Sequence, residues 1–216
     1  MSSIAKLTAS LALTLAAAPA FPAPPADRAQ ALSDLDSPVT ERRAEAVEWV
    51  AQHGSMEDSD LLMKRLRDDS VFVRDFAEQG LWLLWSRSGD PGIDRLMARG
   101  VDQMQAGRHA EAIATFTEVI HRRPEFAEAW NKRATVEYLA GNYPASIADC
   151  DQVLRRNPRH FGALSGYGQI YFEQAQYDKA IRWWRRALEV NPNLLGVEFN
   201  LKRAEERLRE AREHTI

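Results

Sequence analysis

The chain has 216 residues, of which 45% are hydrophobic and 27% are charged, and its formal net charge at pH 7 is −3. This composition is typical of a soluble, ordered protein. The net charge also excludes an overall basic, nucleic-acid-binding surface, so any basic patch must be local. Glycine and proline number only 11 and 10, and no run of alternating β-branched residues occurs, which favours helices over sheets.

The first twenty residues, MSSIAKLTASLALTLAAAPA, differ from the rest of the chain. One cation, Lys6, precedes an apolar run over residues 7–18, which is too short to span a bilayer of about 30 Å as a helix. The segment ends in the tripeptide APA, the small-x-small pattern of a signal-peptide cleavage site. We therefore predict a signal peptide over residues 1–20 that is cleaved after Ala20. An uncleaved anchor and a plain N-terminal tail are the alternatives.

Residues 21–29, FPAPPADRA, form a proline-rich spacer that we expect to be extended and mobile. The one cysteine, Cys150, has no second cysteine with which to form a disulfide bond, and no cysteine near the signal is available for a lipid. Export without an anchor predicts a periplasmic or secreted protein of bacterial origin, not embedded in the membrane after cleavage.

Residues 30–91 contain a short repeat with an offset of 31 residues between LSDLDSPVTERRAEAVEWV and LMKRLRDDSVFVRDFAEQGL. The aligned pairs are Leu35 and Leu66, Arg43 and Arg74, Ala46 and Ala77, and Val50 and Leu81. An arginine three residues before a small alanine in a second helix resembles HEAT-type helical repeats. The resemblance implies that such an arginine bonds to an aspartate of the loop, and Asp68 or Asp69 could serve Arg74. A generic three-helix cap is the alternative.

Two further stretches connect this segment to the rest of the chain. The apolar run LWLLW, residues 81–85, is expected to pack against the first helix that follows it. The turn-rich stretch SRSGDPG, residues 86–92, is the predicted joint.

Residues 93–194 repeat with an offset of 34 and without insertions, as units 93–126, 127–160 and 161–194. Each unit reads as two helices joined by a turn and closed by a proline, which cannot continue a helix. The equivalent residues are Gly107, Gly141 and Ala175; Ala112, Ser146 and Ala180; Phe116, Cys150 and Trp184; Val119, Val153 and Ala187; and Pro124, Pro158 and Pro192.

This pattern resembles the tetratricopeptide repeat family over 102 residues. Gly100 and Gly168 match the family's small eighth position. The turn tyrosine is matched by Tyr143 and Tyr177, and the closing proline by all three prolines. Ala134 and His109 depart from the pattern at the eighth position and at the turn, but both are compatible with it. The resemblance implies an all-α fold, a right-handed α-solenoid of three helix pairs preceded by the HEAT-like helices.

Residues 195–216 carry apolar residues at the spacing of one helical face, Leu201, Ala204, Leu208 and Ala211. The other faces are charged, as expected for the capping helix of a repeat stack. A helix that binds a partner is the alternative.

Stacked helix pairs line a concave groove with their first helices. By analogy with the family, nine residues are predicted to face this groove: Met97, Val101, Met104, Asn131, Thr135, Tyr138, Ser165, Gln169 and Phe172. They mix soft apolar groups with amides and hydroxyls, which suits an apolar or amphipathic peptide. The alternative is a groove filled by the chain's own helices. Met97 and Val101 stand where family members that grip a C-terminal carboxylate have lysine and asparagine, so we predict no chaperone-tail recognition of that type.

A possible second surface comprises Trp183 and the arginines Arg122, Arg123, Arg155 and Arg156. Trp184 shares its position with Phe116 and Cys150 and is predicted to lie in the core, whereas Trp183 should be more exposed. Arg159 and His160 extend the basic edge formed by the arginines. Cations at helix C-termini complement the helix dipole, and an anionic partner is the alternative.

No catalytic constellation emerges from the sequence. The five histidines are dispersed, and none has the i, i+4 spacing of a helical metal site. Asp149 and Asp151 diverge by about 200° around a helix and cannot share one ion. We therefore predict a non-enzymatic scaffold without cofactor or metal that binds a protein or peptide and no nucleic acid, and homo-oligomerisation is possible. A self-assembling module and an enzyme with a dispersed site are the alternatives.

Overall fold

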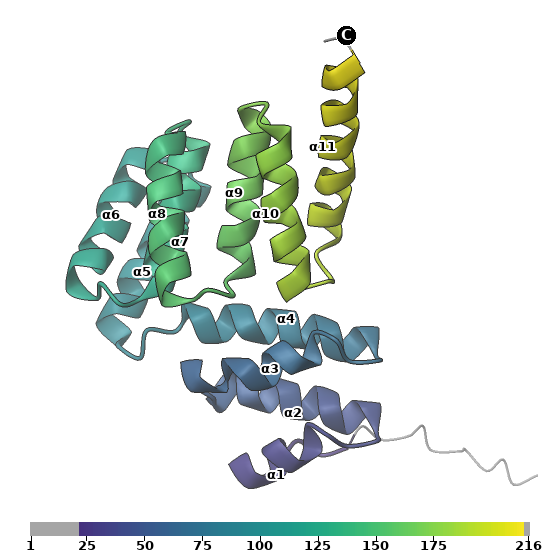
Figure 1. Ribbon diagram of the computed structural model, residues 1–216. Coiled ribbons are helices and arrows are strands. Elements are labelled where there is room, and N and C mark those ends of the chain that lie inside the picture. The colour runs from purple at the N-terminus through teal and green to yellow at the C-terminus, as the bar shows by residue number, and fades with distance from the viewer. Residues whose placement is uncertain (1–21, 214–216) are drawn as a thin grey trace, which may run out of the picture.

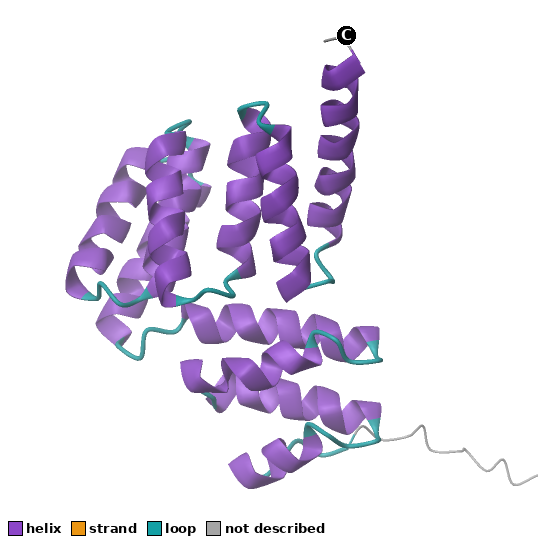
Figure 2. Cartoon of the chain, in the orientation of Figure 1, coloured by secondary structure: helices purple, strands orange, loops and turns teal. Residues whose placement is uncertain are grey.

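The computed structural model describes residues 22–213, and all the regular structure in that range is helical (Figure 2). The predicted signal peptide, residue 21 and residues 214–216 lie outside the described residues. Two stacks of helices that run in clearly different directions meet in Figure 1. Within the described range, no helix is both long and apolar enough to cross a membrane.

The N-terminal stack consists of four α-helices and a short 3-10 helix. In chain order these are α1 (Arg28–Asp34), α2 (Thr40–His53), η1 (Met56–Asp58), α3 (Ser59–Arg65) and α4 (Val71–Ser86). One apolar cluster holds them together, with Val47, Leu62 and Leu81 fully buried. The predicted spacer over residues 21–29 overlaps the start of this stack. Helix α1 already begins at Arg28, and Pro25 is buried in the described structure.

Arg43 links the two halves of this N-terminal stack. Its guanidinium donates two hydrogen bonds to the Asp68 carboxylate, at 2.9 and 2.8 Å, and a further one to Asp69. Arg74, for which the sequence suggested these aspartates, bonds to both through their backbone carbonyls, at 2.8 Å to Asp68 and 3.3 Å to Asp69, and it also donates to the Asn193 side chain at 2.9 Å. The aspartate carboxylates are therefore used by the arginine of the preceding helix pair. The resemblance to HEAT repeats stays a prediction.

The second stack contains three antiparallel helix pairs and a final single helix (Figure 1). The helices are α5 (Pro91–Gln105), α6 (His109–Arg122), α7 (Ala127–Leu139), α8 (Tyr143–Arg156), α9 (Phe161–Glu173), α10 (Tyr177–Val190) and α11 (Leu195–Glu213). The three pairs follow the three 34-residue units, except that α5 begins ahead of the first unit, at Pro91. Helix α11 packs against α10 through Leu201, Ala204 and Leu208. The arrangement is an α-solenoid.

The same turn joins the two helices of every unit. Gly107 and Gly141 have φ angles of 69° and 78°, in the left-handed region that glycine adopts at little cost. Ala175 occupies the equivalent place with φ 56°. The third turn therefore carries a side chain where the backbone favours none, at a cost of about 1 kcal/mol.

The eighth position of each unit is matched to the residue that it faces on the second helix. A methyl group on Gly100 would come within 2.5 Å of the Phe116 ring, and one on Gly168 would overlap the Trp184 indole. In the middle unit, Ala134 packs against the much smaller Cys150. The departure at Ala134 therefore has a simple cause, since a small partner leaves room for a methyl group.

The N-terminal stack crosses the ends of the second stack through α4 (Figure 1). Trp85 stacks on His160 at a ring-centroid distance of 4.5 Å and contacts Phe161 at 4.9 Å. Trp82 contacts the same two rings. The expectation that LWLLW packs against the first repeat helix is therefore wrong. This apolar run covers the link between the second and third units, where the Phe161 ring at the start of α9 is buried by the two tryptophans.

Candidate functional site

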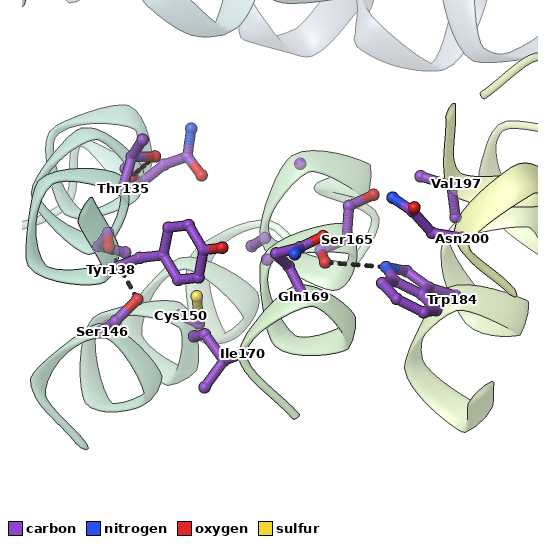
Figure 3. A pocket seen from close by; sticks show the side chains of 15 residues that line it. Thr135, Tyr138, Ser146, Cys150, Ser165, Gln169, Ile170, Trp184, Val197 and Asn200 are labelled. Carbon is purple, nitrogen blue, oxygen red and sulfur yellow. Dashed lines mark hydrogen bonds between the residues drawn. The ribbon is translucent and has the colours of Figure 1, made fainter. Parts of the chain in front are cut away.

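A cavity of about 240 Å³ opens between α7 and α9 and is bounded at one end by α11 (Figure 3). Its lining residues are Asn131, Ala134, Thr135, Tyr138, Ser146, Cys150, Gly162, Ala163, Ser165, Gly166, Gln169, Ile170, Trp184, Val197 and Asn200. None of them is charged, and apolar atoms dominate the lining. A site of this size and character suits an apolar side chain with polar groups around it.

The cavity exists because the middle unit is built from small side chains. Cys150 takes the position that Phe116 and Trp184 fill in the neighbouring units. Ala134 and Ser146 flank it, and across the gap α9 presents Gly166, where an added methyl group would meet only the Cys150 sulfur, at 3.6 Å. Small residues on three helices thus leave space that aromatic rings occupy elsewhere in the stack.

Amide and hydroxyl groups surround this apolar floor. The hydroxyls of Thr135 and Ser165 donate to carbonyls of their own helices, at 2.9 and 2.7 Å. The Tyr138 hydroxyl lies 3.4 Å from Glu173, and burial with the nearby carboxylate raises the pKa of Tyr138, so the phenol stays protonated. Asn200 points from α11 toward Ser165 (Figure 3) and has no hydrogen-bond partner among the described residues. Its amide is free to bond to a peptide backbone.

The structure brings together five of the nine residues predicted to face the groove. Asn131, Thr135, Tyr138, Ser165 and Gln169 all line the cavity. The sequence did not predict the lining residues at the floor, such as Cys150, or those from α11, Val197 and Asn200. The floor had a signal in the alignment of the units, because Cys150 is the small member of an otherwise aromatic position.

The other four predicted groove residues do not line this cavity. Met97 is 6% exposed in the core of the first unit, and Val101 and Met104 pack against the same core. Phe172 packs against Trp184 and Tyr177 in the α10–α11 core. These apolar side chains pack against the adjacent cores, which removes part of their surface from water.

A buried polar pair is linked to the cavity through Asn131, which lines it. Glu128 and His160 are both 0% exposed, and their side chains are 3.0 Å apart. Asn131 and Lys132 each approach the Glu128 carboxylate to 3.0 Å. Burial alone would raise the pKa of Glu128, but the hydrogen bond from His160 and the charges of His160 and Lys132 outweigh it, and the pKa is lowered.

The prediction that His160 belongs to an exposed basic edge is therefore wrong, because the α4 tryptophans cover the ring. The repeat alignment held a signal for this. His160 falls where the first and third units have the apolar residues Phe126 and Leu194.

Cys150 is a packing residue. It is 2% exposed, and burial together with Asp149 and Asp151 raises the pKa of its thiol to about 12, so the thiolate is scarce at neutral pH. Asp149 pairs with Arg133 at 2.7 Å, while Asp151 accepts from the Tyr167 hydroxyl. The two carboxylates thus have different partners, and no cluster of three potential metal ligands occurs within residues 22–213.

The possible second surface is largely engaged in local contacts. Trp183 lies between the Tyr167 ring, stacked at 4.0 Å, and the Arg186 guanidinium at 4.5 Å. This packing accounts for its position.

Most arginines of that surface are also engaged in local contacts. Arg122 pairs with Glu118, Arg123 donates to Glu125 at 2.7 Å, and Arg156 donates to the Pro124 carbonyl at 2.6 Å. Arg155 is exposed on α8. Three of these four arginines thus serve the neighbouring helix ends and acidic side chains.

The described residues form an all-helical repeat protein with an uncharged cavity between α7 and α9 of its second stack. Comparison with known proteins names the repeat. Residues 97–155 and residues 161–194 each match a family model described as tetratricopeptide repeat. The chain contains tetratricopeptide repeats.

Relatives and solved structures agree with this assignment. A TPR repeat-containing protein of Rhizobium etli is 36% identical over 110 residues, which is 51% of this chain and 54% of that protein. The alignment therefore spans about half of the relative. The Sgt2 TPR domain from Aspergillus fumigatus superposes with a TM-score of 0.55 at 21% identity, over 57% of this chain and 83% of the domain. The first TPR of Spaghetti (RPAP3), bound to the HSP90 peptide SRMEEVD, gives 0.52 at 22% identity, over 54% and 92%.

Proposed function

We propose that this protein is a non-enzymatic adaptor that binds a segment of another protein in the cavity between α7 and α9. The observation that carries the proposal is the cavity itself, an uncharged pocket of about 240 Å³ with an apolar floor at Cys150. An apolar side chain of the partner enters the pocket, and Asn200, Tyr138 and Gln169 hydrogen-bond its backbone. The solved TPR domain with a bound HSP90 peptide supports a peptide as the ligand class.

The comparison with that domain also marks a difference. Its peptide, SRMEEVD, is acidic, whereas no cation lines the cavity of this chain. Met97, at the place of a family lysine, is buried in the core. The adaptor therefore recognises a different kind of segment.

The N-terminal sequence adds a location to the proposal. The run over residues 7–18 and the APA tripeptide support export of the chain to the envelope of a bacterium, with cleavage after Ala20. N-terminal sequencing of the protein purified from the periplasmic fraction tests this directly. A chain that retains Met1, or that stays with the cytoplasm, contradicts it.

The binding test uses one position with two substitutions. Gly166→Ala adds a methyl group that meets only the Cys150 sulfur at ordinary contact distance, whereas Gly166→Leu fills the cavity. The wild-type protein first selects binders from a displayed library of random 12-residue peptides. The dissociation constants of the enriched peptides are then measured by fluorescence anisotropy for all three proteins.

We expect Gly166→Ala to bind like the wild type, within about 2-fold, and Gly166→Leu to bind at least about 10-fold more weakly, since the anchor side chain loses its pocket. Circular dichroism establishes that both variants are folded. If no peptide is enriched, or if Gly166→Leu binds as well as Gly166→Ala, the cavity is not a binding site.

A further inference from the structure

A second cavity adjoins the first one and has a different chemical character. It has a volume of about 490 Å³ and lies between α4 and the start of α11. Its lining residues are Asp75, Glu78, Gln79, Trp82, Asn193, Leu194, Leu195, Gly196 and Val197. Val197 lines both cavities. The Trp82 ring covers Gly162 of the first cavity so closely that a methyl group there would lie 2.5 Å from it.

The second cavity is acidic. Asp75 is exposed and has no partner in the part of the chain that the structure describes. Glu78 accepts one hydrogen bond, from the Asn191 amide at 2.8 Å, and this neutral donor brings no positive charge to the carboxylate. Two carboxylates thus line the second cavity, which lies next to the uncharged one.

Two cations that contact residues of the cavity wall, Lys132 and Arg74, are already engaged. Lys132 lies 6.0 Å from the Trp82 ring centroid, and its ammonium is 3.0 Å from the buried Glu128 carboxylate. Arg74, next to Asp75, directs its guanidinium to Asn193 at 2.9 Å and to the Asp68 carbonyl. Neither side chain lines the cavity, so the charges of Asp75 and Glu78 remain available to a ligand.

We infer that the partner segment carries a lysine or arginine beside its apolar anchor, and that α4 of the N-terminal stack is part of the binding groove. This inference rests on the proposed function of the first cavity. The apolar side chain enters the pocket above Cys150, and the cation reaches Asp75 and Glu78 past Val197. The charge complementarity commits the groove to a basic amphipathic segment, the opposite of the acidic peptide in the solved neighbour.

Specific contacts hold α4 of the N-terminal stack next to the second stack. Trp82 and Trp85 hold α4 against the link between the second and third units through His160 and Phe161. Asn193 bonds to both Arg74 and the Leu66 carbonyl, which ties the start of α11 to the same stack. The contacts thus fix α4 beside the uncharged cavity.

The experiment compares the wild type with Asp75→Asn/Glu78→Gln in the full chain. The amide introduced by Glu78→Gln can still accept the hydrogen bond from Asn191, so the fold is preserved. The control, Asp102→Asn/Glu206→Gln, removes the same charge from exposed residues of α5 and α11. All three proteins select from the same library of random 12-residue peptides.

We expect peptides enriched by the wild type and by the control to pair apolar residues with an excess of lysine and arginine. The Asp75→Asn/Glu78→Gln variant should bind these peptides about 3- to 10-fold more weakly while keeping the apolar preference. Added salt should weaken binding to the wild type and hardly affect the variant.

Two results would overturn the inference and leave the proposed function intact. In the first, peptides that lose affinity for Gly166→Leu are neutral or acidic. In the second, such peptides bind Asp75→Asn/Glu78→Gln as tightly as the wild type. If no selected peptide binds Gly166→Leu more weakly than the wild type, both the inference and the proposed function are overturned.

Discussion

The middle repeat unit and its two neighbours have the same backbone but differently filled interiors. The first and third units place an aromatic ring against a glycine, Phe116 on Gly100 and Trp184 on Gly168. The middle unit places Cys150 against Ala134 and leaves a cavity. It also closes with a buried histidine bonded to Glu128, where its neighbours have Phe126 and Leu194. A repeat can thus keep its fold while one unit exchanges packing for a pocket.

The largest expected effect concerns the polar closure of the middle unit. His160→Ala leaves the Glu128 carboxylate buried without its main partner and should lower the free energy of unfolding by about 3–5 kcal/mol. Urea denaturation followed by circular dichroism measures the change. His121→Ala, at an exposed site on α6, is the control and should stay within about 0.5 kcal/mol of the wild type. A loss below about 1 kcal/mol for His160→Ala would contradict the structural role of the pair.

The second prediction tests the matching of glycine to aromatic ring. Gly168→Ala forces a methyl group into the Trp184 indole and should destabilise the protein by about 1–3 kcal/mol. Ala134→Gly creates no clash and should cost about 1 kcal/mol, through helix propensity and the loss of one methyl contact. The same denaturation experiment compares the two variants. An equal loss of unfolding free energy in the two variants would mean that the residue at the eighth position need not match the size of the residue it faces.

The third prediction concerns pH. The folded-state pKa of Glu128 lies below its unfolded value, so its contribution to stability is present above about pH 4.5 and is lost as the pH falls through the lower, folded-state pKa. Between pH 7 and pH 3.5, the wild type should therefore lose more stability than Glu128→Gln. Urea midpoints measured across this range give the difference. Parallel curves for the two proteins would show that Glu128 is not the acid-sensitive group.

The smallest expected effect lies in the third turn. Ala175→Gly removes a side chain from a residue with φ 56° and should stabilise the protein by about 1 kcal/mol. Thermal unfolding should show a slightly higher midpoint than the wild type. Gly141→Ala, at the equivalent turn with φ 78°, is the reverse control and should lower it. A destabilising Ala175→Gly would contradict the strain at this turn.

The sequence predicted the helix pairs well because each depends on local signals repeated every 34 residues. The offset placed Trp184 in the core, and that residue is 1% exposed. Five groove residues were placed at the cavity because they lie on first helices that face the same side. Composition favoured helices over sheets, and the resemblance to tetratricopeptide repeats implied the all-helical class.

What the sequence did not predict depends on contacts between distant segments. The burial of His160 requires α4 to fold back over the second unit, a contact between segments far apart in the chain that no local pattern encodes. Met97 and Phe172 were expected in the groove, but Met97 is buried in the core of the first unit and Phe172 packs, partly buried, against the α10–α11 core. The acidic cavity joins Asp75 and Glu78 to the start of α11 and is invisible in either segment alone.

The most direct test of the central claim rebuilds the neighbours' pattern in the middle unit. The double variant Ala134→Gly/Cys150→Phe places a ring against a glycine, as Phe116 lies against Gly100, and fills the cavity. The account predicts a folded protein, with a melting temperature within a few degrees of the wild type, that no longer binds the peptides selected by the wild type. A folded double variant that binds those peptides with unchanged affinity would contradict it.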